Sequence, residues 1–88
     1  MKLHDGFITY TSGSEQIMVA AGSASAVFRG MVRSNETAAY IIDSLKVEIS
    51  REELLEKLVA RYDAPREIIG RDLDMILLNL RKIGALDE

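Results

Sequence analysis

The chain has 88 residues, which is the size of one small domain, expected to span residues 1–88. Its composition, 48% hydrophobic and 28% charged, is globular, and its net charge of −3 disfavours a nucleic-acid partner, because such domains usually carry a basic excess. The absence of cysteine excludes disulfides, iron–sulfur clusters and thiolate zinc sites.

Neither a metal nor a cofactor is expected from the remaining residues. The single histidine, His4, lies in a polar stretch and cannot hold a metal alone. The sequence has no apolar run of about 18 residues that would span a membrane, and its start has no signal-peptide pattern. We therefore expect a cytoplasmic protein that makes no contact with membranes.

The first third of the sequence predicts strands. Phe7–Tyr10 and Gln16–Ala20 are rich in β-branched and apolar residues, and the turn-forming stretch TSGSE separates them. A connection of small residues, AGSASA, leads to a third predicted strand, Phe28–Arg33. Short connections favour an antiparallel meander, in which the third strand lies at an edge.

Two helices are predicted next. The first begins near Ser34–Asn35, where either side chain can cap the first free N–H groups, and its apolar residues recur at helical spacing. The second opens with Ser50 and, three residues later, Glu53, which is the pattern of a capping box. Its buried stripe is expected to comprise Leu54, Leu55, Leu58, Val59 and Tyr62.

A third helix is predicted from Asp63–Pro65 to about Ile83, with Gly84 as its stop. It has a continuous core face, formed by Ile69, Leu73, Ile76, Leu77, Leu80 and Ile83. Three short strands followed by three helices predict an α+β fold of the winged helix-turn-helix type, with a three-stranded antiparallel sheet placed first.

A second strip on the third helix lies about 100° around from the core face. It contains Ile68 and Met75 together with Asp72 and Asn79. One interpretation is a broad buried face in a small domain. The other is a partly apolar groove wall with polar groups that orient a ligand.

The order of these motifs resembles the PqqD family. The resemblance covers nearly the whole chain, through FRGMVRSNETAAYI (28–41), the capped helix, RYDAPRE (61–67) and LLNLRKIGAL (77–86). Its most specific part is Phe28–Gly30–Met31 followed by Asn35–Glu36–Thr37. The family takes its name from pyrroloquinoline quinone biosynthesis protein D. It belongs to the RiPP recognition elements, which bind leader peptides of ribosomally made, modified peptides.

The resemblance implies a protein that is not an enzyme and has no catalytic residue. Family members bind the leader as a strand added to the third strand, beside the third helix, and present the precursor to a modifying enzyme, often a radical SAM enzyme. The predicted peptide-binding residues are Phe28, Arg29, Gly30, Met31, Val32 and Arg33 of the strand, and Ile68, Arg71, Asp72, Met75 and Asn79 of the helix.

The residues of the third strand fit an edge that accepts a peptide. A glycine within a strand weakens packing but lets another backbone approach closely, although Gly30 is also explained by a simple bulge. Arg29 and Arg33 blunt an edge against indiscriminate pairing and attract acidic leader residues, unless they are only solvated charges. An open edge also leaves room for a homodimer or for strand exchange.

Two other functions fit the sequence less well. A winged-helix DNA-binding protein is the alternative, but the basic residues of the third helix alternate with Glu67, Asp72 and Asp74, and non-specific DNA affinity comes mainly from phosphate neutralisation. A small enzyme finds less support, because the sequence offers neither a plausible triad nor a phosphate loop.

Overall fold

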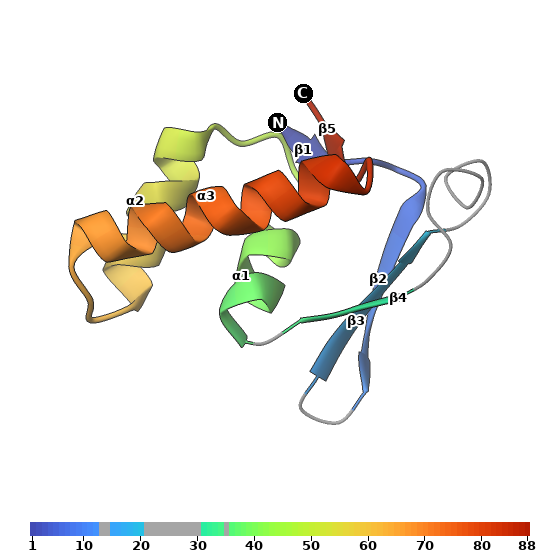
Figure 1. Cartoon of the computed structure of the whole chain (residues 1–88), viewed down its shortest axis with the longest axis horizontal. Helices are drawn as coiled ribbons and strands as arrows, with labels where there is room; N and C mark the ends of the chain where they lie inside the picture. The colour runs from blue at the N-terminus through green and yellow to red at the C-terminus, as the bar shows by residue number, and fades with distance from the viewer. Residues whose placement is uncertain (13–14, 21–30, 35) are drawn as a thin grey trace.

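The described part of the chain, residues 1–12, 15–20, 31–34 and 36–88 of a computed structural model, forms an α+β fold with three helices and antiparallel strands (Figure 1). The predicted fold class is therefore confirmed at that level. The strands form two sheets, whereas the sequence predicted one. Residues 28–30 of the predicted third strand and Asn35 lie outside the described residues.

The larger sheet has the strand order β2-β3-β4, with β2 at Phe7–Ser12, β3 at Glu15–Ala20 and β4 at Met31–Ser34. Both pairings are antiparallel, as expected for short connections. The turn predicted at TSGSE is shorter than expected, because β2 and β3 extend to Ser12 and Glu15. The first helix begins at Glu36, which confirms the prediction of a start near Ser34–Asn35, and Ser34 itself is the last residue of β4.

The smaller sheet pairs β1 (Lys2–Leu3) with β5 (Leu86–Asp87). This sheet was not predicted, because strands of two residues have no recognisable periodicity. Its surroundings tie both ends of the described chain to the core: the Leu3 N–H donates to the Leu45 carbonyl at 2.7 Å, and the His4 N–H donates to the Ala85 carbonyl at 2.7 Å.

The first two helices are α1 (Glu36–Ser44) and α2 (Arg51–Arg61). The predicted capping box of α2 is confirmed. The Glu53 N–H donates to the Ser50 hydroxyl at 3.1 Å, and the Ser50 N–H donates to the Glu53 carboxylate at 3.2 Å. These two bonds satisfy backbone donors that the helix itself leaves unpaired.

The third helix, α3, spans Arg66–Lys82 and crosses the other two helices in Figure 1. It ends where the sequence predicted: Ile83 is the C-cap residue, and Gly84 has a φ of 75°, a left-handed conformation that glycine adopts without strain. The predicted core face is buried at Ile69, Leu73, Leu77 and Leu80, whereas Ile76 and Ile83 are partly buried against the core.

The core lies between the helices and one face of the larger sheet. Met18, in the central strand, has no exposed surface, and Phe7 is also buried. The opposite face of β2 carries Ile8 and Tyr10, which are 51% and 49% exposed. Figure 1 shows the three helices on one side and the β2–β3 hairpin extending beyond them.

Candidate functional site

The candidate site begins at β4, the terminal strand of the larger sheet. Within the described ranges, β4 pairs only with β3, through the register Gln16↔Ser34, Ile17↔Arg33, Met18↔Val32 and Val19↔Met31. Its position at the edge agrees with the sequence prediction. An edge strand presents backbone donors and acceptors that the sheet does not use.

One hydrogen bond identifies the direction of the backbone groups in β2. The Phe7 N–H donates to the His4 carbonyl at 3.0 Å and so points away from β3. In an antiparallel pair, the N–H and C=O of one residue point to the same side, and successive residues alternate. Thr9 therefore points away from β3, whereas Ile8 and Tyr10 pair with the opposite residues of β3, Val19 and Ile17.

The same alternation continues through β3 into β4. Since Ile17 and Val19 pair with β2, Met18 must direct its N–H and C=O toward β4, where Val32 lies opposite. Val32 and Ser34 consequently form the ladder with β3. The backbone groups of Met31 and Arg33 point outward from the sheet. The sequence could not show which alternate residues of this strand face outward, and the register now identifies them.

One flank of α3 faces α1. Ile68, which is 50% exposed, and Asp72 line a cavity of about 170 Å³ together with Thr37 and Ile41 of α1 and residues at the end of α2. Because α1 begins two residues after the last residue of β4, this cavity lies near the Ser34 end of the open edge. The structure thus brings Ile68 and Asp72 close to one end of β4.

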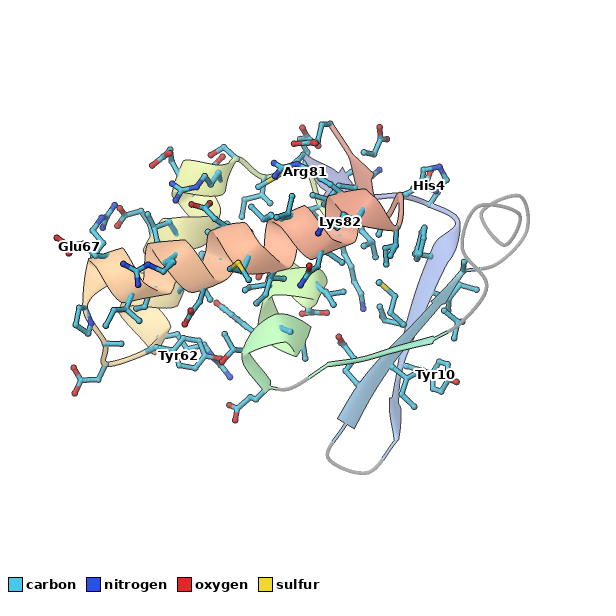
Figure 2. All side chains as sticks on the ribbon, viewed as in Figure 1. His4, Tyr10, Tyr62, Glu67, Arg81 and Lys82 are labelled. Carbon is cyan, nitrogen blue, oxygen red and sulfur yellow. The ribbon has the colours of Figure 1, made fainter. Side chains whose placement is uncertain are left out.

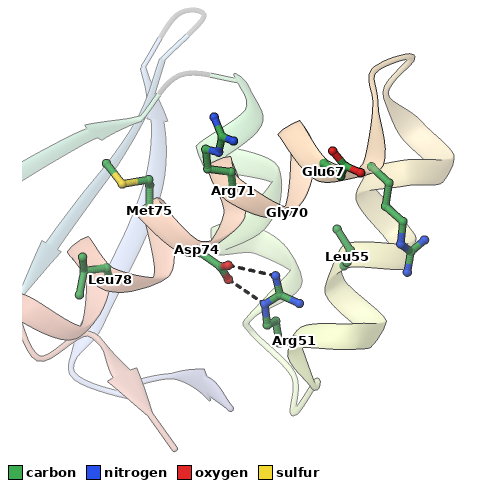
Figure 3. A pocket seen from close by; sticks show the side chains of 9 residues that line it. Arg51, Leu55, Glu67, Gly70, Arg71, Asp74, Met75 and Leu78 are labelled. Atoms are coloured by element: carbon green, nitrogen blue, oxygen red, sulfur yellow. Dashed lines mark hydrogen bonds and ion pairs between the residues drawn. The ribbon is translucent and has the colours of Figure 1, made fainter.

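A second flank of α3 faces α2. Arg71 and Met75 line a wide, open groove of about 590 Å³ that also includes Leu55, Gly70 and Leu78 (Figure 3). Met75 is 57% exposed, which agrees with the inference that it lies off the core stripe. Ile68 and Met75 thus line different hollows, although they lie only about 20° apart around α3. Asn79 is exposed and lines neither hollow.

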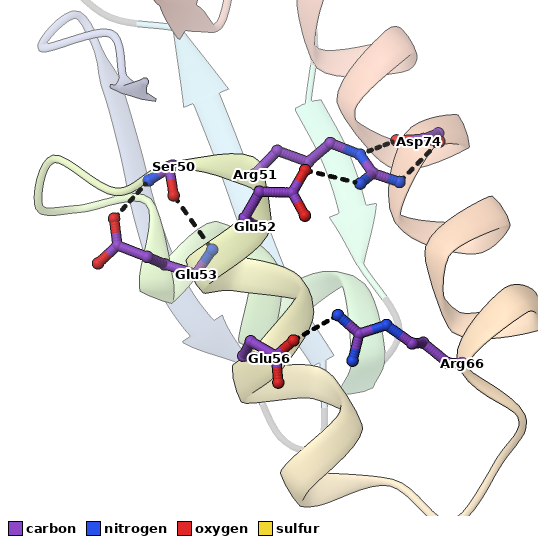
Figure 4. A network of polar contacts seen from close by, with 7 residues as sticks. All are labelled: Ser50, Arg51, Glu52, Glu53, Glu56, Arg66 and Asp74. Atoms are coloured by element: carbon purple, nitrogen blue, oxygen red, sulfur yellow. Dashed lines mark hydrogen bonds and ion pairs between the residues drawn. The ribbon is translucent and has the colours of Figure 1, made fainter.

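Ion pairs hold α2 and α3 together along this groove (Figure 4). Arg51 donates to both carboxylate oxygens of Asp74, at 2.7 and 3.0 Å, and Arg66 contacts Glu56. The hydrogen bond from Arg51 lowers the pKa of Asp74, and the bond from Arg66 lowers the pKa of Glu56. Each of these carboxylates thus has a cationic partner on the neighbouring helix, and the two pairs join α2 to α3.

The sequence did not predict an aromatic and cationic cluster beside the cavity. The Arg61 guanidinium lies 4.4 Å from the ring centre of Tyr40 and 5.8 Å from that of Tyr62, and the two rings meet edge to face. The Tyr62 hydroxyl raises the pKa of Arg61, although no hydrogen bond of ordinary geometry joins the two. Arg61 and Tyr62 are neighbours, but the contact with Tyr40 depends on tertiary packing and has no sequence signal.

Two other kinds of site are absent from the described residues. The described residues contain no group of three or more histidine, aspartate or glutamate side chains arranged to hold a metal ion. In the same part of the chain, each helix is too short or too polar to cross a membrane.

Comparisons with solved structures support the fold. The structure of TbiB1 in complex with the TbiA(beta) leader peptide has a TM-score of 0.82 and 20% identity, and the alignment covers 99% of this chain and 95% of that chain. A lasso peptide synthetase B1 complexed with the leader peptide has a TM-score of 0.76 and 19% identity, with 96% and 93% covered. At these identities the likeness establishes a common fold.

The sequence comparisons identify the family. No curated protein matches this chain. The family model described as coenzyme PQQ synthesis protein D (PqqD) matches residues 15–86, a range that includes β3, β4 and all three helices. The chain therefore belongs to the PqqD family.

Proposed function

We propose that this protein is a non-catalytic peptide-binding adaptor. It binds the leader of a ribosomally made precursor peptide as a strand added to β4, and it presents the precursor to a modifying enzyme. Membership of the PqqD family and a fold common to two proteins solved with leader peptides support this proposal. We extend the proposal to a cytoplasmic location and to a radical SAM enzyme as the partner.

The observation that carries the proposal is the outward direction of the Met31 and Arg33 backbone groups. Strand addition requires unpaired N–H and C=O groups at regular spacing along an edge. Met31 and Arg33 are separated by one residue, which gives that spacing. An added peptide strand therefore forms two hydrogen bonds with each of them. Phe28–Gly30, which precede β4, and Val32, which lies between the two donors, complete the strand part of the proposed site.

The helix part of the proposed site follows from the two flanks of α3. Ile68 and Asp72, at the cavity near the Ser34 end of β4, are suited to a leader side chain with an apolar body, and Asn79 lies two turns along from Asp72. Arg71 and Met75 line the groove beside α2, and Met75 lies only about 20° around α3 from Ile68. We include both residues in the proposed peptide-binding surface.

We propose that the fold is of the winged helix-turn-helix type. DNA binding by a winged helix is disfavoured here, because two cations of α3 are already paired. Arg66 contacts Glu56, and Arg81 donates to Glu88 at 2.9 Å. An acidic chain with paired helix cations gains little from phosphate contacts.

Calorimetric titration tests the proposal. The probe is a cognate precursor peptide, synthesised as separate leader and core halves. The leader half should bind, and the core half should release no binding heat under the same conditions. Equal binding of both halves would contradict recognition of the leader.

A further inference from the structure

The sheet has a second edge, formed by β2, and we propose that two copies of this chain pair there to form a symmetric dimer. The two β2 strands run antiparallel about a twofold axis, and the two sheets join into one of six strands. This dimer goes beyond the proposed function and does not depend on it. Both β4 strands remain at the outer edges of the joined sheet, where each stays accessible to a peptide.

Strand β2 lacks the features that usually prevent an edge strand from pairing with a strand of another molecule. Proteins usually guard such edges with charged residues, proline, bulges or very short strands. The β2 sequence FITYTS has no charge, proline or glycine, and all six residues pair with β3 without a bulge. By contrast, β4 contains Arg33. Self-association of a neutral strand brings no like charges together, although each chain carries a net charge of −3.

The alternation of backbone groups defines what this edge offers. Thr9 and Thr11 point their N–H and C=O groups away from β3, and in the described residues the backbone of Ile8–Ser12 has no hydrogen bond outside the ladder. The outward N–H of Phe7 is already used by His4. The edge therefore has two complete pairs of donors and acceptors, on Thr9 and Thr11.

These two residues select one register for a twofold pairing. If Thr9 pairs with the partner's Thr11, symmetry pairs Thr11 with the partner's Thr9, and all the outward groups of both residues are satisfied. Pairing Thr9 with the partner's Thr9 would instead set Thr11 opposite the partner's Phe7, whose N–H is not available. The first register places Tyr10 opposite the partner's Tyr10 on the twofold axis.

The arrangement of the helices leaves space for this dimer. The helix nearest the larger sheet, α1, packs against β3 and β4, and the β2–β3 hairpin extends beyond the helices (Figure 1). Tyr10 lies on the side of the strands that faces away from the helices (Figure 2). Tyr10, about half exposed in one chain, is covered from the side by the Tyr10 of the second. Aromatic cross-strand pairs stabilise sheets.

Cysteine cross-linking tests the register, and the chain has no cysteine of its own. In the proposed dimer Tyr10 faces the partner's Tyr10 in a pair without hydrogen bonds, with Cα atoms about 4.5 Å apart, within the range for a disulfide. Ile8 lies four residues from the partner's Ile8, about 13 Å along the strand, which is too far. Ile8→Cys is therefore a matched control from the same strand and the same face.

Under mild oxidation, Tyr10→Cys should form a disulfide-linked dimer at least tenfold faster than Ile8→Cys at the same protein concentration. Equal rates, or no cross-link in either folded variant, would overturn the proposed register. Sedimentation of the unmodified chain gives an independent test. Its apparent mass should rise with concentration toward that of a dimer, and a monomer at the highest soluble concentration would overturn the dimer itself.

Thr9→Pro removes the outward N–H twice per dimer, whereas Thr9→Ala keeps it. The dimer dissociation constant should be about 5- to 150-fold higher for the proline variant than for the alanine variant. The two variants should also bind the leader half equally, which separates failure of the dimer from failure of the peptide site. Equal dissociation constants for the dimers of both variants would contradict hydrogen bonding through Thr9.

Discussion

Proline substitutions in β4 test the assignment of its backbone groups. Proline removes one N–H donor and fixes φ near its strand-compatible range. Val32→Pro removes a donor of the ladder with β3, whereas Arg33→Pro removes a donor that points outward. Each variant is compared with alanine at the same position, so that the loss of the side chain cancels. Met31→Pro should behave like Arg33→Pro.

The expected magnitudes follow from the two environments. Val32 lies opposite Met18, which has no exposed surface, so the loss of its N–H leaves a buried carbonyl without a partner. Such an unpaired group costs about 1–3 kcal/mol, which lowers the melting temperature of a domain this size by about 4–24 °C. The Arg33 N–H is not part of the ladder, so Arg33→Pro should melt within a few degrees of Arg33→Ala.

Peptide binding should show the opposite pattern. Loss of one hydrogen bond to an added strand should weaken binding of the leader half by about 2- to 13-fold in Arg33→Pro, with any steric cost in addition. Calorimetry well below the melting temperature gives both constants. The reasoning is refuted if all the proline variants melt alike, or if weaker binding simply follows lower stability.

Other substitutions test the site and the fold. Ile68→Glu should weaken leader binding, while the matched exposed Leu78→Glu should not, and both should keep wild-type helical content by circular dichroism; equal losses would contradict a specific role of Ile68 in binding. The Arg51 bond holds the pKa of Asp74 below its ordinary value, so its stabilisation is present above about pH 4 and disappears as the pH falls through the folded-state pKa. The melting temperature of Asp74→Asn should therefore depend less on pH in that range, and an unchanged slope would exclude a contribution from this pair. Gly84→Ala should destabilise the chain by about 1 kcal/mol, measured by urea unfolding, because of its positive φ; no change would contradict the left-handed conformation at Gly84.

The features that the sequence predicted well depend on residues close together along the chain. Ser50 and Glu53 form the capping box within one turn, and Gly84 ends α3 through its own backbone conformation. The core face of α3 repeats at helical spacing, so its burial follows from the pattern alone. The edge position of β4 followed from the short connections of the meander.

The features that the sequence did not predict depend on distant residues. Arg51 and Asp74 lie 23 positions apart, and Lys2 of β1 pairs with Asp87 of β5, so neither contact has a local signal. The helical period placed Ile68 and Met75 on one strip, but it could not show that they line different hollows, which depend on where α1 and α2 pack. The outward residues of β4 were identified only through the bond between Phe7 and His4.

Amide hydrogen exchange, measured residue by residue with and without the leader half, tests the central claim most directly. In the free protein, the Met31 and Arg33 amides should exchange fast, whereas the Val32 and Ser34 amides should be protected by the ladder with β3. On addition of the leader half, Met31 and Arg33 should become protected, and Val32 and Ser34 should change little. Unchanged exchange at Met31 and Arg33 in the bound state would contradict strand addition at β4.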